Sequence, residues 1–144
     1  MEPIERLLAE RECERLVMRY SLAVNSWDID AFVDLFTPDA VWQRPKVAAL
    51  RGHDEIRAFM QSQPLERTLR HVDGLCMVTI DDDGRTAASI SQTTVYDTPG
   101  IHDLPAPLRQ PHMVVEYRDR LVRTPEGWRF ASRHTTQVFS AEAV

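Results

Sequence analysis

The sequence predicts an α+β fold in which helices from the first half of the chain cover one face of a curved antiparallel sheet formed by the second half. Before Pro64, apolar residues recur at steps of three and four, the spacing of helices that bury one face. After Pro64, long runs rich in Val, Thr, Ile and aromatic residues are typical of strands. Two tight turns that end in glycine, DDDG at 81–84 and TPEG at 124–127, imply two antiparallel hairpins.

Three helices and one short strand are expected in the first half. The apolar steps predict a first helix from about Pro3 to Val24, with the proline in its first turn. Asp28 is the expected N-cap of a second helix, which Thr37-Pro38-Asp39 would end. A short apolar strand at 40–42 precedes the third helix. The expected cap of that helix is His53 or Asp54, and its expected inward residues are Ile56, Phe59 and Met60.

Four long strands are expected in the second half, within one domain that spans residues 1–144. Their ranges are Leu69–Ile80, Thr86–Tyr96, Met113–Val122 and Trp128–Phe139. The connection at 97–111 is long for a hairpin loop and holds four of the nine prolines. A loop of this length is more often a lid or an interface loop than a domain linker.

Composition and charge exclude several classes of protein. The net charge of −5, without a dense Lys/Arg run, argues against a nucleic-acid partner. No stretch approaches the roughly 20 apolar residues of a membrane span, and the charged N-terminus does not resemble a signal peptide. Two cysteines, Cys13 and Cys76, are too few for a disulfide framework. We therefore expect a cytoplasmic protein with no membrane or nucleic-acid partner.

Several short motifs follow one another in an order typical of a known family. They are Arg19-Tyr20, FTPDAVW at 36–42, Arg51-Gly52 with Ile56, Arg70-His71, and YRDRLVRTPEGWRFASR at 117–133. On these, nearly the whole chain resembles the SnoaL-like branch of the nuclear-transport-factor-2-like superfamily. The resemblance implies a cone-shaped barrel, in which the curved sheet wraps around a pocket that helices close. This superfamily hosts dehydratases, isomerases, dehydrochlorinases, polyketide cyclases and subunits without chemistry of their own.

The resemblance also implies the catalytic residues. In similar lyases and dehydratases, a histidine on the first long strand pairs with a carboxylate after the first helix; here these positions are His71 and Asn25. An arginine on the last strand matches Arg133, and a tyrosine of the first helix matches Tyr20. An imidazole with a pKa near 6.5 can take or give a proton at neutral pH.

Asparagine at position 25 is the main departure, because its carbonyl accepts a hydrogen bond but brings no charge. Three alternatives follow: Asp73 supplies the charge, His71 acts alone on an already acidic C–H, or Asn25 polarises a carbonyl. Purely structural roles are also open. These are hydrogen bonding alone for His71, a helix C-cap for Asn25, an ion pair with Asp119 for Arg133, and core packing for Tyr20.

Alternation along the strands predicts which side chains face the pocket. If His71 points inward, Trp42 floors or flanks the cavity, and His134 points away. Asp73 would lie on the same side as His71. The resemblance implies the inward residues of the following strands, which are Gln92, Thr94, Tyr96, Met113, Val115, Tyr117, Arg133, Thr135 and Gln137. Such a pocket suits a small, mostly apolar substrate that carries a few oxygens.

The sequence therefore favours a small lyase or isomerase, similar to dehydratases and cyclases, that acts on a small, mostly apolar ring substrate bearing oxygens. No pair of histidines or cysteines has the spacing of a metal site, and no nucleotide-binding fingerprint occurs, so neither metal nor cofactor is expected. In this interpretation His71 moves the proton, while Arg133, Tyr20 and Asn25 hold a developing negative oxygen. The alternatives are a non-catalytic ligand-binding or assembly protein and the small subunit of a ring-hydroxylating oxygenase. Apolar residues on both sides of several strands predict a homodimer or homotrimer.

Overall fold

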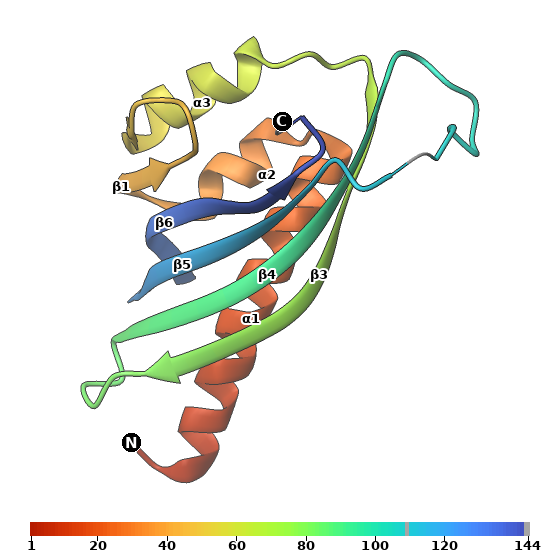
Figure 1. The fold of residues 1–144 in the computed structure, drawn as a ribbon. Coiled ribbons are helices and arrows are strands. Elements are labelled where there is room, and N and C mark those ends of the chain that lie inside the picture. The colour runs from red at the N-terminus through yellow and green to blue at the C-terminus, as the bar shows by residue number, and fades with distance from the viewer. Residues whose placement is uncertain (109, 143–144) are drawn as a thin grey trace.

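A six-stranded, strongly curved sheet wraps around one long helix in the computed structural model, which describes residues 1–108 and 110–142 (Figure 1). The strand order is β2-β1-β6-β5-β4-β3, and every neighbouring pair is antiparallel except β1 and β6. The strands are β1 (Phe36–Gln43), β2 (Leu50–Arg51), β3 (Arg67–Ile80), β4 (Thr86–Pro99), β5 (Met113–Thr124) and β6 (Gly127–Ser140). The predicted α+β class and the four long strands are confirmed.

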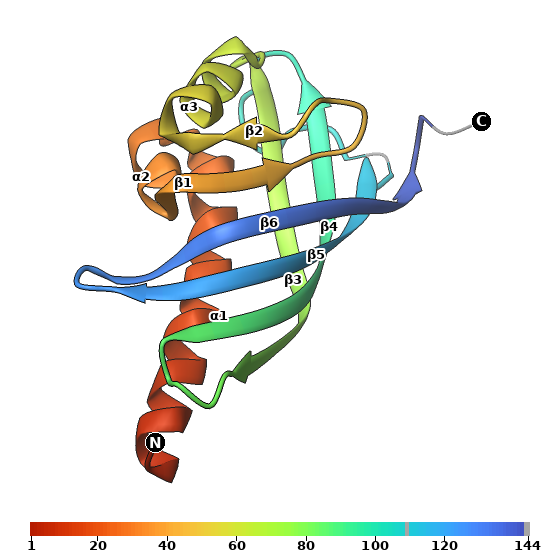
Figure 2. The ribbon, with the colours of Figure 1, turned by 90° about the vertical axis from the view of Figure 1, so that its left-hand side faces the viewer.

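Three helices lie on the concave side and at one end of this sheet. They are α1 (Pro3–Ser26), α2 (Ile29–Asp34) and α3 (Gly52–Ser62). The helix α1 runs along β3, while α2 and α3 pack beside β1 (Figures 1 and 2). The helix α1 begins with the expected proline, Pro3. It ends before Trp27, whose backbone is in the left-handed region at φ 56°. Asn25 therefore lies inside the helix and is not its C-cap.

The predicted boundaries of α2 and α3 are correct in part. Asp28 caps α2 as expected, because its side chain accepts a hydrogen bond from the Ala31 N–H at 3.1 Å. The helix already ends at Asp34, and Thr37-Pro38-Asp39 belongs to β1, which is a correction.

The N-terminus of α3 also differs from the prediction. Gly52 begins the helix in a left-handed conformation, and Arg51 occupies the N-cap position without a capping side-chain bond. The Nε2 atom of His53 lies 2.7 Å from the carbonyl oxygen of Phe36, so this imidazole ties α3 to the start of β1. Neither His53 nor Asp54 is the cap, since both lie within the first turn.

An aromatic cluster fills the closed end of the cone. Tyr20 of α1 lies at its centre, with ring centroids of its neighbours 5.0–6.5 Å away. These neighbours are Phe32, Phe36, Trp42, Tyr117 and Phe130. Burying such rings stabilises the fold, and Tyr20, Trp42 and Tyr117 of this cluster also line the cavity.

The outer surface keeps several exposed apolar side chains. On the sheet they include Val72, Leu75, Met77, Val138 and Phe139. The homo-oligomer expected from such residues stays a prediction. None of the described helices combines the length and the apolar composition that a membrane span requires. Cys13 and Cys76 are free thiols on α1 and β3.

Candidate active site

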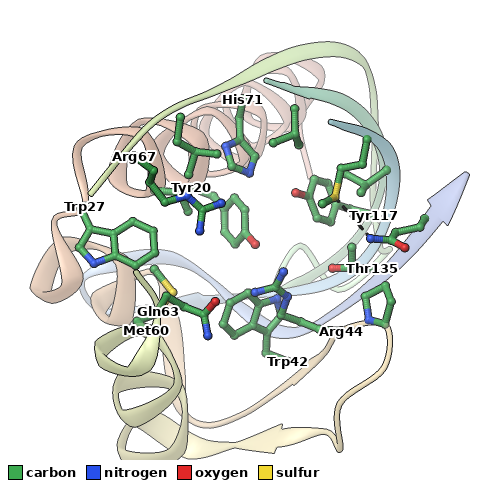
Figure 3. A pocket seen from close by; sticks show the side chains of 17 residues that line it. Tyr20, Trp27, Trp42, Arg44, Met60, Gln63, Arg67, His71, Tyr117 and Thr135 are labelled. Carbon is green, nitrogen blue, oxygen red and sulfur yellow. Dashed lines mark hydrogen bonds between the residues drawn. The ribbon is translucent and has the colours of Figure 1, made fainter. Parts of the chain in front are cut away.

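A cavity of about 100 Å³ opens between α1, α3 and the concave face of the sheet (Figure 3). Aromatic, aliphatic and cationic side chains line it. The labelled ones in Figure 3 are Tyr20, Trp27, Trp42, Arg44, Met60, Gln63, Arg67, His71, Tyr117 and Thr135. None of the described lining residues is an aspartate or a glutamate.

His71 and Asn25 form one hydrogen-bonded unit at the wall of this cavity. The Oδ1 atom of Asn25 accepts the backbone N–H of His71 at 2.7 Å and lies 3.0 Å from Nδ1 of its ring. Because a backbone N–H can only donate, it fixes this amide atom as oxygen, and Nδ1 must then carry the ring proton. The Nε2 atom is left with a free lone pair, and the imidazole points into the cavity (Figure 3).

The surroundings of His71 disfavour its cationic form. Burial, followed by the positive charges of Arg44, Arg133 and Arg67, lowers the pKa of His71 from 6.5 to about 4. The imidazole is therefore neutral at pH 7. It is a weaker base than a free imidazole, and its protonated form is a stronger acid than a free imidazolium.

Two tyrosines direct their hydroxyl groups into the same space. Tyr20 comes from α1 and Tyr117 from β5, and both hydroxyls point toward the middle of the cavity (Figure 3). Burial, with the neighbouring Tyr20, raises the pKa of Tyr117 well above its ordinary value. Its phenol thus stays protonated and can donate a hydrogen bond to a negative oxygen.

Arg133 does not line the cavity, which corrects the prediction that it contacts substrate. Its guanidinium makes two hydrogen bonds, of 2.8 and 2.9 Å, to the carboxylate of Asp119. Both side chains are fully buried, and Ser89 donates a further bond to Asp119 at 2.8 Å. The Cζ atom of Arg133 lies 4.2 and 3.8 Å from the ring centroids of Tyr20 and Tyr117. The guanidinium of Arg133 therefore packs against the rings of both tyrosines without itself lining the cavity.

Asp73 is not the missing carboxylate partner of His71. Its Oδ1 atom accepts hydrogen bonds from the hydroxyls of Ser21 and Thr93, at 2.7 and 2.8 Å. No hydrogen bond or ion pair between Asp73 and His71 occurs in the described structure. The hypothesis that Asp73 replaces the carboxylate is wrong; the carboxylate instead joins α1 to β3 and β4.

Three predicted pocket residues of β4 face the other way. Gln92, Thr94 and Tyr96 lie on the outer side of the sheet, and Tyr96 lines surface grooves beside the 97–111 loop. The register explains this correction: His71 pairs directly with Val95, and opposite residues share a face. The inward residues of β4 are therefore Ser89, Ser91, Thr93 and Val95.

The remaining predicted pocket residues lie where they were expected. Trp42 forms a wall of the cavity, and Met113, Tyr117, Thr135 and Gln137 line it from β5 and β6. Gln137 donates its amide Nε2–H to the sulfur of Met113 at 3.6 Å. The described residues of the 97–111 loop take no part in this lining, and Arg109 lies outside the described residues. The lid interpretation of that loop therefore has no support in this conformation.

Sequence reasoning missed four polar or aromatic residues of the cavity: Trp27, Arg44, Gln63 and Arg67. A usable signal existed for two of them. Arg44 follows Trp42 by two positions and Arg67 precedes His71 by four, so alternation places each on the inward side. Arg67 is held by a forked ion pair with Asp97.

The described residues, 1–108 and 110–142, contain no group of three or more His, Cys, Asp or Glu side chains that could hold a metal ion. The chemistry that these side chains can perform is proton transfer at Nε2 of His71, with hydrogen-bond donors and cations nearby. A curved-sheet cone with a histidine in a cavity between the sheet and the helices defines a class of small α+β proteins, and within that class the fold alone does not fix the function.

The chain belongs to the family described as the SnoaL-like domain, which matches residues 5–134. Three solved structures are similar to it. An NTF2-like protein with a cystatin-like fold from Novosphingobium aromaticivorans is 25% identical, with a TM-score of 0.76 over 95% of this chain and 87% of that one. A candidate scytalone dehydratase from the same organism is 15% identical, with a TM-score of 0.84 over 99% and 93%.

The third structure is a hexachlorocyclohexane dehydrochlorinase, LinA type 2, at 10% identity and a TM-score of 0.80 over 99% of this chain and 94% of that one. Among curated proteins, none matches the sequence. The similarity to the last two structures establishes the fold, and the match of the SnoaL-like domain establishes the family.

Proposed function

We propose that the protein is a cofactor-independent lyase or isomerase in which His71 moves a proton. The observation that carries this proposal is the neutral imidazole whose Nδ1–H is held by Asn25 and whose free Nε2 faces the cavity. A base must be unprotonated and must be within reach of the C–H bond that it attacks. The burial that lowers the pKa of His71 meets the first requirement at neutral pH.

The reaction proceeds by removal of a proton beside a carbonyl group. Nε2 of His71 takes the proton, and the electron pair of the C–H bond moves to form an enolate. In an elimination this pair then forms a C=C bond as the leaving group departs, and the imidazolium returns its proton to a departing hydroxide. In an isomerisation the proton returns to a different carbon. Tyr20 and Tyr117 donate hydrogen bonds to the enolate oxygen.

Asn25 determines which substrates suit this site. Without a carboxylate the imidazolium is unstable, so His71 removes protons only from carbons that are already acidic. The same instability makes the imidazolium an effective acid toward a leaving hydroxyl group. A β-hydroxy carbonyl compound combines an acidified C–H with a poor leaving group and is therefore the substrate type that we infer.

A deuterium-exchange screen tests the proposal without knowledge of the natural substrate. Small β-hydroxy ketones and enolisable cyclic ketones are incubated with protein in D₂O, and loss of the α-proton and formation of alkene are followed by NMR. We expect exchange or elimination with the wild type and its loss in His71→Ala. His134→Ala is the matched control, because this exposed histidine on β6 points away from the cavity.

A non-catalytic binding protein is the second candidate, and the neutral partner of His71 favours it. It predicts no exchange with any compound and unchanged ligand affinity in His71→Ala. Equal exchange by wild type and His71→Ala would also contradict the catalytic proposal.

A further inference from the structure

Arg44 is a cavity cation whose charge no described residue balances. It follows β1 and is half-buried in the cavity wall. The ion pairs of the described residues include those of Arg67 with Asp97 and Arg133 with Asp119, but none that involves Arg44. Withdrawing a guanidinium from water without an anionic partner is unfavourable, so an unbalanced cation in a cavity indicates a ligand that brings the charge.

Two aromatic rings hold the guanidinium in one place. Its Cζ atom lies 5.1 Å from the ring centroid of Trp42 and 4.9 Å from that of Phe59. These rings are themselves perpendicular, at 89°, with centroids 5.5 Å apart. The cation therefore rests in the angle between two ring systems, which attract it by cation–π interaction and orient its N–H groups.

The charge of the cavity is opposite to that of the protein. The chain has 22 acidic and 17 basic side chains, yet the described lining holds Arg44 and Arg67 and no carboxylate. Arg67 is already neutralised by Asp97. One guanidinium is thus left for a ligand, and a single planar fork matches a carboxylate in two parallel hydrogen bonds.

We propose that the substrate carries a carboxylate that Arg44 binds, with its reacting carbon directed toward His71. This assignment rests on the proposed function for the role of the reacting end. Arg44 and His71 enter the cavity from opposite walls, so one small molecule can meet both (Figure 3). The cavity has a volume of about 100 Å³, which favours a small carboxylic acid.

Binding of a carboxylate at Arg44 should also change the basicity of His71. Arg44 is the first of the three charges that lower the pKa of His71, after burial itself. A carboxylate paired with Arg44 offsets that charge and raises the pKa of His71, so that a correctly bound substrate strengthens its own base. A neutral analogue of the same shape lacks this effect.

Binding of crotonate and crotonamide to the wild type tests the proposal, since these two molecules share size and shape and differ in charge. Affinity is measured by NMR titration at constant ionic strength. We expect crotonate to bind roughly 10- to 100-fold more tightly than crotonamide, the range of a charge-assisted pair. Saturation with crotonate, and not with crotonamide, should raise the pKa of His71.

Three variants test whether Arg44 causes the preference for crotonate over crotonamide. Arg44→Gln should abolish the preference for crotonate, and Arg44→Lys should retain part of it because the charge remains without the fork. Arg70→Gln is the matched control, because Arg70 precedes His71 on the same strand but is exposed. Thermal unfolding confirms that each variant is folded.

Other outcomes separate this inference from the proposed function. Equal binding of the two probes by the wild type, or an unchanged preference in Arg44→Gln, overturns the carboxylate assignment. Binding of inorganic phosphate as tightly as crotonate overturns it too, because the site would then be a general anion site. Loss of turnover in His71→Ala with the crotonate preference intact supports both conclusions, whereas turnover that persists in His71→Ala contradicts only the proposed function.

Discussion

The Oδ1 atom of Asn25 accepts two hydrogen bonds from His71, one from its backbone N–H and one from Nδ1 of its ring. This pair orients the imidazole as a carboxylate partner would but adds no negative charge. An aspartate at position 25 would both orient the imidazole of His71 and increase its basicity, whereas Asn25 only orients it. This difference can be measured.

Asn25→Asp should raise the pKa of His71 by roughly one to three units, because an opposite charge within hydrogen-bond distance favours the imidazolium. NMR titration of the ring protons measures this shift. With a stronger base, deuterium exchange of weakly acidic C–H compounds should become faster. Ser26→Asp is the control, since it adds the same charge one residue later on the exposed face of α1. An unchanged pKa in Asn25→Asp would show that the two side chains do not interact in solution.

The stability of the protein should decrease as pH falls from 6.5 toward 4. In this window the unfolded chain binds a proton at His71, whereas the folded protein does not, since its pKa is lowered to about 4. The neutral folded form is thus favoured above pH 6.5, and the loss through this window is on the order of 3 kcal/mol for a shift of this size. Urea unfolding at several pH values measures it.

The difference between wild type and His71→Gln isolates this effect from the titration of carboxylates. His71→Gln should lose less stability over the same pH range, while His134→Gln should behave like the wild type. Parallel curves for wild type and His71→Gln would contradict the lowered pKa.

Much of the architecture could be predicted from the sequence because its signals are local. Asp28 caps α2 as predicted, and the glycine-ended turns place Gly84 and Gly127 at positive φ where the hairpins reverse. Prediction also placed Trp42 and Tyr117 in the cavity, since both occupy the inward positions of apolar strands.

The orientation of β4 could not be predicted, because its register depends on a long-range pairing. The family resemblance indicated the wrong face, and the hydrophobic pattern did not correct it, because the outward residues Ile90 and Tyr96 are more apolar than the inward Ser89 and Ser91. The inward hydroxyls serve buried carboxylates instead: Ser89 donates to Asp119, much as Thr93 donates to Asp73. These hydrogen bonds place polar side chains of β4 inside the cone, against the hydrophobic pattern of the strand. They depend on residues far apart in the sequence, so the sequence of β4 alone does not predict them.

Asp119→Asn should destabilise the protein strongly. The carboxylate is the partner of a fully buried arginine, and removing one member of a buried ion pair leaves an uncompensated charge that costs roughly 3–5 kcal/mol. Chemical denaturation measures the change in the free energy of unfolding. Asp81→Asn is the matched control, because its ion pair with Arg120 is exposed and should contribute little to stability. A loss of unfolding free energy in Asp119→Asn that is as small as the loss in Asp81→Asn would refute a structural role for the Arg133 pair.

Tyr117→Phe should lower the rate of the proposed reaction by about 100-fold while leaving the fold intact. The substitution removes one hydroxyl that points into the cavity and keeps the ring on which the Arg133 guanidinium rests, 3.8 Å from its centroid. Loss of one donor to a developing oxyanion has an effect of about this size. Tyr96→Phe provides the control, since it deletes the same hydroxyl from the outer side of β4.

Steady-state rates with the substrate identified by deuterium exchange, together with melting temperatures, separate catalysis from stability for these two variants. A slow Tyr117→Phe protein that melts with the wild type places the hydroxyl in the reaction. A rate reduced in proportion to a lowered melting temperature means that Tyr117 acts only through packing against Arg133. Equal losses in Tyr96→Phe would place the reaction outside the cone, because the two hydroxyls lie on opposite faces of the sheet.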